Sequence, residues 1–154
     1  KRFCELKKRI GSVIYNGDGV YIHGVNGTGK TMLAVDLIKR IVEIKLTKAE
    51  EPRGIIFEIA GVMLKNVSDF DSDINWLDVY SRCNVLVIDN LEGNETRLIP
   101  MFIKRFAAKK FFIATGTLAP VQYGNDMRDL RDRLKCCHIF VTSGTSQRKP
   151  ATTL

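Results

Sequence analysis

Short apolar stretches alternate with amphipathic stretches along this chain. Each apolar stretch spans about five residues, which is typical of strands buried on both faces of a parallel sheet. Five strands are therefore predicted, at Val20–Gly24, Ile55–Ile59, Val85–Ile88, Phe111–Thr115 and His138–Thr142.

The segments between these strands place apolar side chains three and four residues apart, as one face of a helix does. Helices are predicted over residues 31–46, 61–67, 74–83, 96–110 and 125–135, and residues 1–16 are expected to form a basic arm or helix. Pro100 is expected in or near the first turn of its helix, where proline is tolerated. The alternation predicts an α/β fold, with a parallel sheet covered on both faces and one domain over residues 1–154.

The composition is ordinary for a globular protein, and its basic charge permits an anionic partner, although a basic protein without one has the same composition. The chain has 154 residues, of which 45% are hydrophobic and 27% charged, and no apolar run approaches the roughly 20 residues of a membrane span. The basic N-terminal residues do not resemble a signal peptide, so we expect a cytoplasmic protein with reduced cysteines and no membrane partner. The net charge of +7 favours an anionic partner, most commonly nucleic acid. The first residue is Lys1 rather than Met, so a partner-binding domain is expected ahead of this segment.

The segment GVNGTGKT, Gly24–Thr31, matches the phosphate-loop pattern G-x-x-x-x-G-K-[ST] in full. Its glycines let backbone N–H groups turn inward around phosphate oxygens, and the positive end of the following helix adds to this attraction. Lys30 is expected to reach the β- and γ-phosphates, and Thr31 to bind magnesium through its hydroxyl. The residues predicted to bind ATP or ADP are Gly24, Val25, Asn26, Gly27, Thr28, Gly29, Lys30, Thr31 and Met32.

A predicted strand leads directly into Asp89 and Asn90. Asp89 is predicted to hold Mg²⁺ together with Thr31, directly or through water. Asn90 stands where many nucleotide hydrolases carry a second acid that activates water. An amide cannot accept a proton at neutral pH, so slow hydrolysis is expected. Glu92 and Glu95 lie close enough in the sequence to supply the missing carboxylate.

The order of the motifs resembles the AAA+ ATPase domain of bacterial and phage replicative helicase loaders of the DnaC/DnaI type, and of the related IstB transposition ATPases. The phosphate loop and the acid strand are followed by FFIATGTL, RDLRDRL and VTSGTSQRK, in that order. The predicted strand Ile55–Ile59 lies between the loop and the acid, which favours a P-loop fold with a strand inserted between these two elements. The resemblance covers roughly residues 17–149 and implies an AAA+ fold whose helical lid is largely absent.

The resemblance also implies roles for residues in the second half of the chain. FFIATGTL resembles the sensor-1 strand, with Thr117 in the place of the asparagine that senses the γ-phosphate. LRDRL resembles the box that carries an arginine finger, which makes Arg133 the finger and Arg131 the nearby alternative, although Arg133 could also pair with acids on its own helix. GTSQR implies that Arg148 contacts the nucleotide. The implied catalytic residues are Lys30, Asp89, Asn90, Thr117 and Arg133.

Helicase loaders imply three partners: a hexameric replicative helicase, single-stranded DNA, and further copies of the chain assembled in an oligomer or spiral. DNA contacts are predicted at Lys65 and, more densely, at Lys104, Arg105, Lys109 and Lys110, unless these side chains simply form solvated helix faces. Nearby aromatic side chains are expected in the core rather than stacked on bases, namely Phe102, Phe106, Phe111 and Phe112.

Two other functions remain open from the sequence. The length and the phosphate loop also allow a small P-loop kinase or other phosphotransferase, although FFIATGTL and the short C-terminal part argue against it. Asn90 keeps open a nucleotide-binding adaptor or decoy with little turnover, because such a protein does not need a general base.

Overall fold

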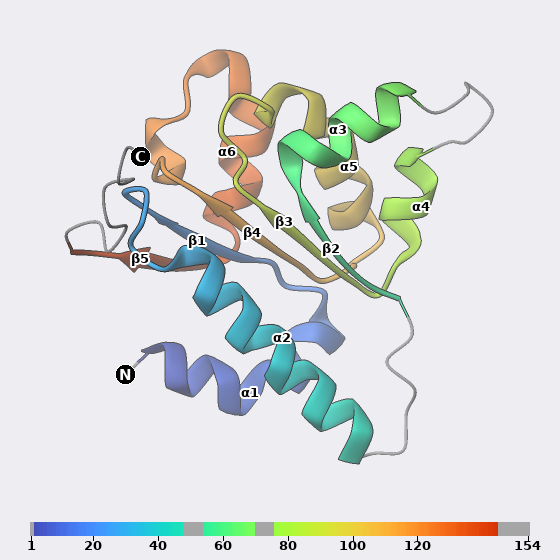
Figure 1. Ribbon diagram of the computed structural model, residues 1–154, viewed down its shortest axis with the longest axis vertical. Coiled ribbons are helices and arrows are strands. Elements are labelled where there is room, and N and C mark those ends of the chain that lie inside the picture. The colour runs from blue at the N-terminus through green and yellow to red at the C-terminus, as the bar shows by residue number, and fades with distance from the viewer. Residues whose placement is uncertain (1, 48–53, 70–75, 145–154) are drawn as a thin grey trace, which may run out of the picture.

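A computed structural model describes residues 2–47, 54–69 and 76–144, without the side chains of residues 45–47, 65–69 and 76. At its centre lies a five-stranded parallel sheet with the strand order β2-β3-β4-β1-β5 (Figure 1). Each strand lies within one residue of its predicted bounds. The strands are β1 (Val20–Gly24), β2 (Ile55–Ile59), β3 (Val85–Asp89), β4 (Phe112–Gly116) and β5 (His138–Thr142).

The strand between the phosphate-loop strand and the acid strand is β4, not β2. β2 precedes β3 in the sequence, as predicted, but it lies at the edge of the sheet beyond β3. β4 pairs with β1 on one side and with β3 on the other. The carboxyl ends of β1, β4 and β3 therefore lie next to one another, and residues that follow these three strands can reach a common site.

Helices cover both faces of the sheet, as predicted (Figure 1). Two helices lie on one face, α1 (Arg2–Asn16) and α2 (Lys30–Thr47). They enclose one core with the alternate strand residues Val20, Ile22, Val85, Val87 and Ile113. The segment predicted as a basic arm or helix is thus helical, because Leu6, Ile10 and Val13 form a buried apolar stripe on it.

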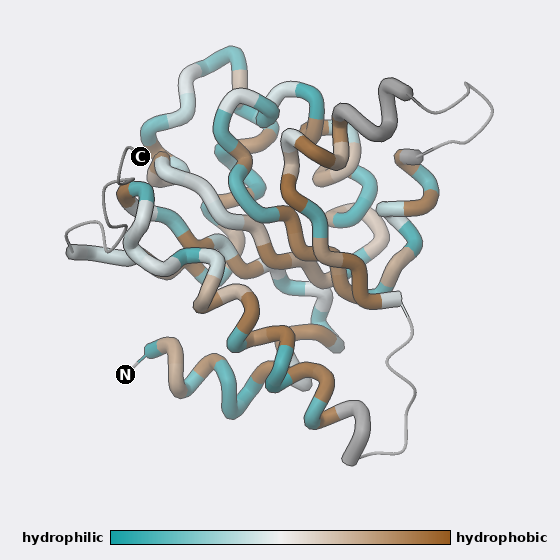
Figure 2. The backbone as a smooth tube through the Cα atoms, in the orientation of Figure 1, coloured by the Kyte–Doolittle hydropathy of each residue, from teal (hydrophilic) through white to brown (hydrophobic). Residues whose placement is uncertain are grey.

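The opposite face carries the remaining helices. They are α3 (Ala60–Asp69), α4 (Trp76–Arg82), α5 (Glu95–Ala107) and α6 (Arg128–Lys135), the last preceded by the short 3₁₀ turns Pro120–Gln122 and Asn125–Met127. They pack against the other set of alternate strand residues, Tyr21, Leu86, Ile88, Phe112 and Ala114. In Figure 2 the hydrophobic colour is concentrated along the strands and on the sides of the helices that face them. This pattern is expected for a sheet that lies between two helical layers.

Two local details qualify the predictions. α5 begins at Glu95, so Pro100 lies in its second turn, near the first as predicted, and the carbonyl of Thr96 loses the N–H that it would otherwise accept. Helices do not fully cover β5 at the sheet edge, where Ile139 is 38% and Val141 67% exposed. Over the described residues, no helix combines the length and apolar character needed to cross a membrane.

Candidate nucleotide-binding site

The predicted phosphate loop joins the end of β1 to the start of α2. Gly27 has a φ of 81° and Gly29 a φ of 89°, both in the left-handed region that favours glycine. The loop can therefore curl back on itself without strain. α2 begins at Lys30, so the positive end of this helix lies at the loop.

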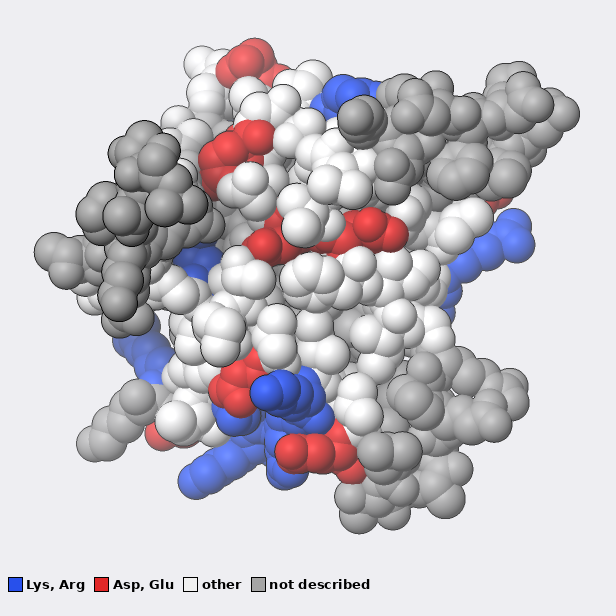
Figure 3. All heavy atoms as spheres, in the orientation of Figure 1, with Lys and Arg blue, Asp and Glu red and all other residues white. Residues whose placement is uncertain are grey.

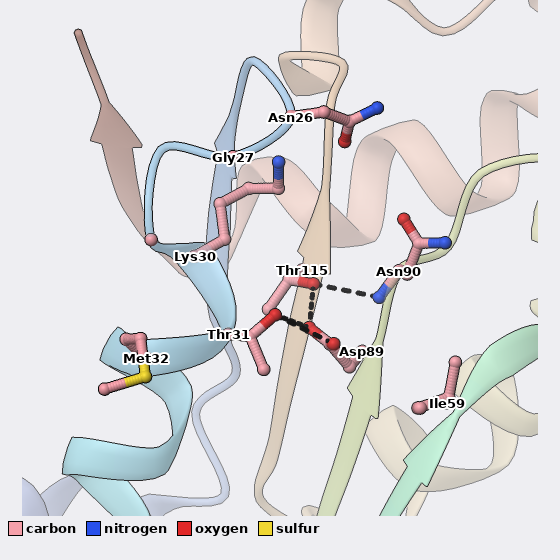
Figure 4. A pocket seen from close by; sticks show the side chains of 10 residues that line it. Asn26, Gly27, Lys30, Thr31, Met32, Ile59, Asp89, Asn90 and Thr115 are labelled. Carbon is pink, nitrogen blue, oxygen red and sulfur yellow. Dashed lines mark hydrogen bonds between the residues drawn. The ribbon is translucent and has the colours of Figure 1, made fainter. Parts of the chain in front are cut away.

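A cavity of about 540 Å³ lies against this loop at the carboxyl ends of the strands (Figure 4). Its volume is typical of small-molecule sites. It is lined by Asn26, Gly27, Gly29, Lys30, Thr31, Met32, Ile59, Asp89, Asn90 and Thr115. The structure thus brings together the phosphate loop, the predicted acid and Asn90, which come from distant parts of the sequence.

Lys30 is held by the carbonyl groups of its own loop. Its Nζ atom donates hydrogen bonds to the carbonyl oxygens of Gly24 at 2.7 Å and Val25 at 3.1 Å, and the residue is 7% exposed. The ammonium group therefore lies inside the curve of the loop. An anion that enters this curve would meet a positive charge already in place.

Asp89 is oriented by two threonine hydroxyls. Thr31 Oγ1 donates to Asp89 Oδ2 at 2.9 Å, and Thr115 Oγ1 donates to Asp89 Oδ1 at 2.6 Å (Figure 4). The predicted pair Thr31 and Asp89 is therefore in direct contact. Both supply the hard oxygen atoms that Mg²⁺ prefers, and Mg²⁺ is usually held by one or two carboxylates together with the phosphates of a substrate. In the part of the chain that the structure describes, no larger cluster of His, Cys, Asp and Glu suggests a metal site held by the protein alone.

Sequence reasoning missed two residues that line the cavity, Ile59 and Thr115, and Thr115 is the one that bonds to Asp89. Besides its bond to Asp89, it accepts the N–H of Asn90 at 2.9 Å through Oγ1 and the N–H of Leu91 at 3.0 Å through its carbonyl. The register of the two strands brings Thr115 beside Asp89. Ala114 of β4 pairs with Ile88 of β3, and Thr115 and Asp89 are the residues that follow them. Thr117, the residue implied by the resemblance, is half-buried beyond the end of β4 and does not line the cavity.

Asn90 has a φ of 64°, which is unusual for a residue other than glycine. Asparagine adopts this left-handed conformation more readily than most residues, because its short polar side chain interacts with the local backbone. Thr115 fixes the conformation through the Asn90 N–H. The backbone where the second acid would stand is thus one that accepts Asn or Asp far better than a bulky residue.

Neither nearby glutamate lines the cavity. Both carboxylate oxygens of Glu92 are buried without a hydrogen-bond partner, and Glu95 is 8% exposed. They lie close to the hydroxyls of Tyr21 and Tyr123, which are 3.2 Å apart, and burial is the main cause that raises the pKa of both tyrosines. Asp89 is accordingly the single carboxylate among the described residues that line the cavity.

His23 lies on β1 immediately before the phosphate loop and is 8% exposed. Burial, and secondly the charge of Lys30, holds the pKa of His23 below its usual range. The imidazole is therefore neutral at neutral pH and adds no second positive charge beside Lys30. The charge that the loop offers to an anion comes from Lys30 and from the helix end.

Of the predicted arginine residues, Arg131 and Arg133 are described, and neither lines the cavity of its own chain. Arg133 donates to the carbonyl oxygen of Asp129 at 2.9 Å and to its carboxylate at 3.3 Å, which is the local pairing that the sequence left open. Arg131 pairs with Asp132 at 3.4 Å. Arg148 lies outside the described residues.

The basic cluster predicted to contact DNA is not one surface. Arg105 is fully buried and donates to the carbonyl oxygens of Tyr80, Cys83, Asn84 and Phe111, so its inclusion in the cluster was wrong. The burial of this guanidinium, which bonds to backbone carbonyls and to the Cys83 Sγ atom at 3.3 Å, was not visible from the pattern of charges. Lys104 pairs with Asp78 at 2.9 Å, and the side chain of Lys65 is not described.

The aromatic residues near this cluster are in the core, as predicted. Phe102, Phe111 and Phe112 are buried, and Phe106 packs partly buried against Phe112. On the face drawn in Figure 3, Lys and Arg gather instead over α1 and α2, with acidic side chains among them. Two of the basic side chains on these helices form ion pairs: Lys7 with Asp36 at 2.8 Å, and Arg40 with Glu43 at 3.1 Å.

Fold and site together define an α/β domain of the P-loop class. No protein-family model matches the chain, and no curated protein matches it. Solved structures do match. DnaI is 16% identical with a TM-score of 0.72, over 96% of this chain and 83% of that one. The DnaC helicase loader is 23% identical with a TM-score of 0.61, over 88% of this chain and 87% of that one.

A third similar structure is the replication initiator DnaA bound to AMPPCP and single-stranded DNA, which is 18% identical with a TM-score of 0.65. The match covers 90% of this chain but 45% of that one, so the chain spans less than half of DnaA. Within the P-loop class, the chain has the fold of the DnaC/DnaI-type AAA+ domain. The fold expected from the resemblance is confirmed.

Proposed function

We propose that this chain is an ATP-binding ATPase of the helicase-loader type, which hydrolyses ATP slowly and assembles on DNA with a hexameric replicative helicase. The observation that carries the proposal is the contact between Thr31 and Asp89 beside a complete phosphate loop. In P-loop proteins this pair of oxygen donors holds Mg²⁺ next to the β- and γ-phosphates. A solved structure of similar fold, DnaA, was determined with AMPPCP, which supports ATP as the ligand.

Within this proposal each residue of the site has a separate task. Lys30 binds the β- and γ-phosphate oxygens, and the loop N–H groups enclose them. Thr31 and Asp89 bind Mg²⁺, which supplies positive charge that stabilises the transferred phosphoryl group. Thr115 keeps the Asp89 carboxylate oriented, and Asn90 orients a water molecule without accepting its proton.

Slow hydrolysis yields a direct test at Asn90. The change Asn90→Asp supplies a carboxylate where the amide now lines the cavity, and Asp tolerates the φ of 64°. We expect ATP turnover to rise about tenfold or more, because general-base catalysis contributes on the order of 10²-fold or more when it is well placed. The measurement is phosphate release at saturating ATP, with the Kd for ATP determined in parallel.

The matched control is Glu92→Gln, which removes the carboxylate that follows Asp89 and Asn90 most closely in the sequence. Its oxygens are buried away from the cavity, so turnover should not change. A drop in turnover in Glu92→Gln would mean that this glutamate moves to the cavity and acts as the base. An Asn90→Asp variant that works at the wild-type rate would show that a missing base does not limit hydrolysis.

Assembly is proposed to bring Arg133 of one copy to the nucleotide of a neighbour. Arg133 does not line the cavity of its own chain. Its guanidinium bonds to the Asp129 carbonyl at 2.9 Å and pairs with the exposed Asp129 carboxylate at 3.3 Å. A guanidinium presented in trans would offset the negative charge that develops on the γ-phosphate. Arg131 is the alternative finger, and Arg148 remains a proposed nucleotide contact.

A hexameric replicative helicase with single-stranded DNA is expected to raise ATP turnover, and Arg133→Ala should remove this rise while the Kd for ATP stays within about twofold. Arg128→Ala is the matched control, because Arg128 is on the same helix, is 77% exposed and pairs with Asp132 at 3.5 Å at the surface. If Arg133→Ala is stimulated like the wild type, the finger assignment fails. If helicase is captured in the presence of ATP but turnover does not respond at all, the adaptor function replaces the loader function.

A further inference from the structure

We propose that Thr142, the last residue of β5, is a positioning residue that holds the phosphate loop in the shape required by nucleotide phosphates. The inference rests on the proposed nucleotide-binding function of this loop. It adds a side chain from the other end of the chain, outside the G-x-x-x-x-G-K-[ST] pattern. Thr142 is 9% exposed and does not line the cavity, so it would act through the loop rather than on the nucleotide.

The backbone of Thr142 lies against the first residue of the loop. Gly24 and Thr142 form the last pair of the ladder between β1 and β5, and β5 ends beside the loop in Figure 4. A Cβ atom on Gly24 would collide with both the carbonyl and the hydroxyl oxygen of Thr142. The start of the loop is therefore pressed against β5 so closely that only glycine fits.

The hydroxyl of Thr142 also holds the middle of the loop. The Oγ1 atoms of Thr142 and Thr28 are 2.6 Å apart, whereas the carbonyl oxygen of His23 is 3.3 Å from Thr142 Oγ1. Each hydroxyl has one proton to donate. Thr28 donates its proton to the Val25 carbonyl at 2.7 Å, so the short contact is best satisfied when Thr142 donates to Thr28. The hydrogen bonds thus run from Thr142 through Thr28 to Val25.

These hydrogen bonds are expected to keep the loop in shape when a phosphate group binds. The Val25 carbonyl also accepts a bond from Lys30 Nζ at 3.1 Å, and Lys30 must turn toward the phosphate oxygens on binding. The Val25 carbonyl then keeps Thr28 as its partner, and Thr28 is itself fixed to the sheet by Thr142. The loop can exchange its lysine contact for a phosphate without losing its curvature.

The test is the affinity for ATP in hydroxyl-deletion variants. Thr142→Val has nearly the same shape but no hydroxyl, and we expect it to weaken ATP binding about tenfold, which corresponds to about 1.4 kcal/mol. Thr142→Ser keeps the hydroxyl and should restore affinity to within about threefold of the wild type. Thr28→Val should lose at least as much affinity as Thr142→Val, because it also removes the bond from Thr28 to the Val25 carbonyl. The double variant should be no worse than Thr28→Val alone, because the link between Thr142 and Thr28 is already absent there. Ser12→Ala, a hydroxyl deletion on α1 that is remote from the loop, is the control.

Each outcome decides the proposal. Wild-type affinity in Thr142→Val overturns it, as do losses that simply add in the double variant. A loss of affinity in Thr142→Ser equal to that in Thr142→Val means that the methyl packing matters and not the hydroxyl. A loss that disappears when variants are compared at equal fractions of folded protein reflects stability alone and also overturns it.

A second readout keeps this test separate from the proposed function. Without nucleotide, the amide hydrogens of residues 25–29 should exchange faster in Thr142→Val than in the wild type, while those of α2 remain protected. If the wild type does not bind ATP, the proposed function fails, and the exchange rates still decide whether Thr142 holds the loop. Unchanged exchange rates overturn the positioning role.

Discussion

Lys30→Ala is expected to weaken ATP binding about 100-fold, the loss that corresponds to about 2.7 kcal/mol of charge-assisted hydrogen bonding to phosphate. Lys30 is the basic side chain among the described residues that line the cavity. Its ammonium group already lies inside the loop, bonded to the carbonyls of Gly24 and Val25. The measurement is a titration with a fluorescent ATP analogue in the presence of Mg²⁺.

The matched control for this change is Lys39→Ala. Lys39 is on the same helix, is exposed to solvent and does not line the cavity, so its removal lowers the net charge equally without touching the loop. Its affinity for ATP should match that of the wild type at moderate salt. Equal affinities in Lys30→Ala and Lys39→Ala would mean that nucleotide does not bind in this loop, and the proposed function would fall.

Arg105→Ala is expected to lower the free energy of unfolding by about 3 to 4 kcal/mol, because it removes the donors for several buried carbonyl groups at once. Arg105 Nη1 donates to the carbonyl oxygens of Tyr80 at 2.7 Å and Cys83 at 2.9 Å, and Nη2 bonds to that of Phe111. The side chain therefore ties the end of α4 to the segments that lead into β3 and β4. The loss should be measured by urea unfolding.

Lys104→Ala is the neighbouring control. Lys104 is half-exposed and pairs with Asp78 at the surface, where removal of an ion pair costs less than about 1 kcal/mol. Arg105→Lys should destabilise the fold as well, because a single ammonium nitrogen cannot reach carbonyls that the planar guanidinium joins on two sides. If Arg105→Lys is as stable as the wild type, the buried charge and not the fork of donors accounts for the stabilisation.

The sequence was sufficient to predict the elements of the fold. All five strands were found from apolar runs, since strands buried on both faces leave little room for polar residues. The structure also brings the predicted phosphate loop and Asp89 together around one cavity. Their chemistry restricts the residue types and their spacing, which is why the sequence points to them, and their roles toward nucleotide and Mg²⁺ stay predictions. These predictions depend on local pattern, which a single sequence displays directly.

What the sequence could not predict depends on neighbours in space. That β4 separates β1 from β3 is a matter of sheet order, and from it follows the contact between Thr115 and Asp89. The pattern of charges predicts that Arg105 is a surface cation, because basic residues surround it in the sequence. It is buried because three chain segments turn their carbonyls toward it. The roles of Thr117, Arg133 and Arg148 stay predictions, since they depend on a bound nucleotide or a second copy.

The sheet order also determines when the site can form during synthesis. β1 pairs only with β4 and β5 among the described strands, and both follow it by some ninety residues or more. The backbone N–H and C=O groups along both edges of β1 therefore stay unpaired until most of the chain has left the ribosome. The phosphate loop begins at the last residue of β1, and it can pack against β5 only after that last strand has been synthesised. Unpaired apolar strands associate readily with one another, so a nascent or truncated chain that stops before His138 would expose β1 as a site of aggregation.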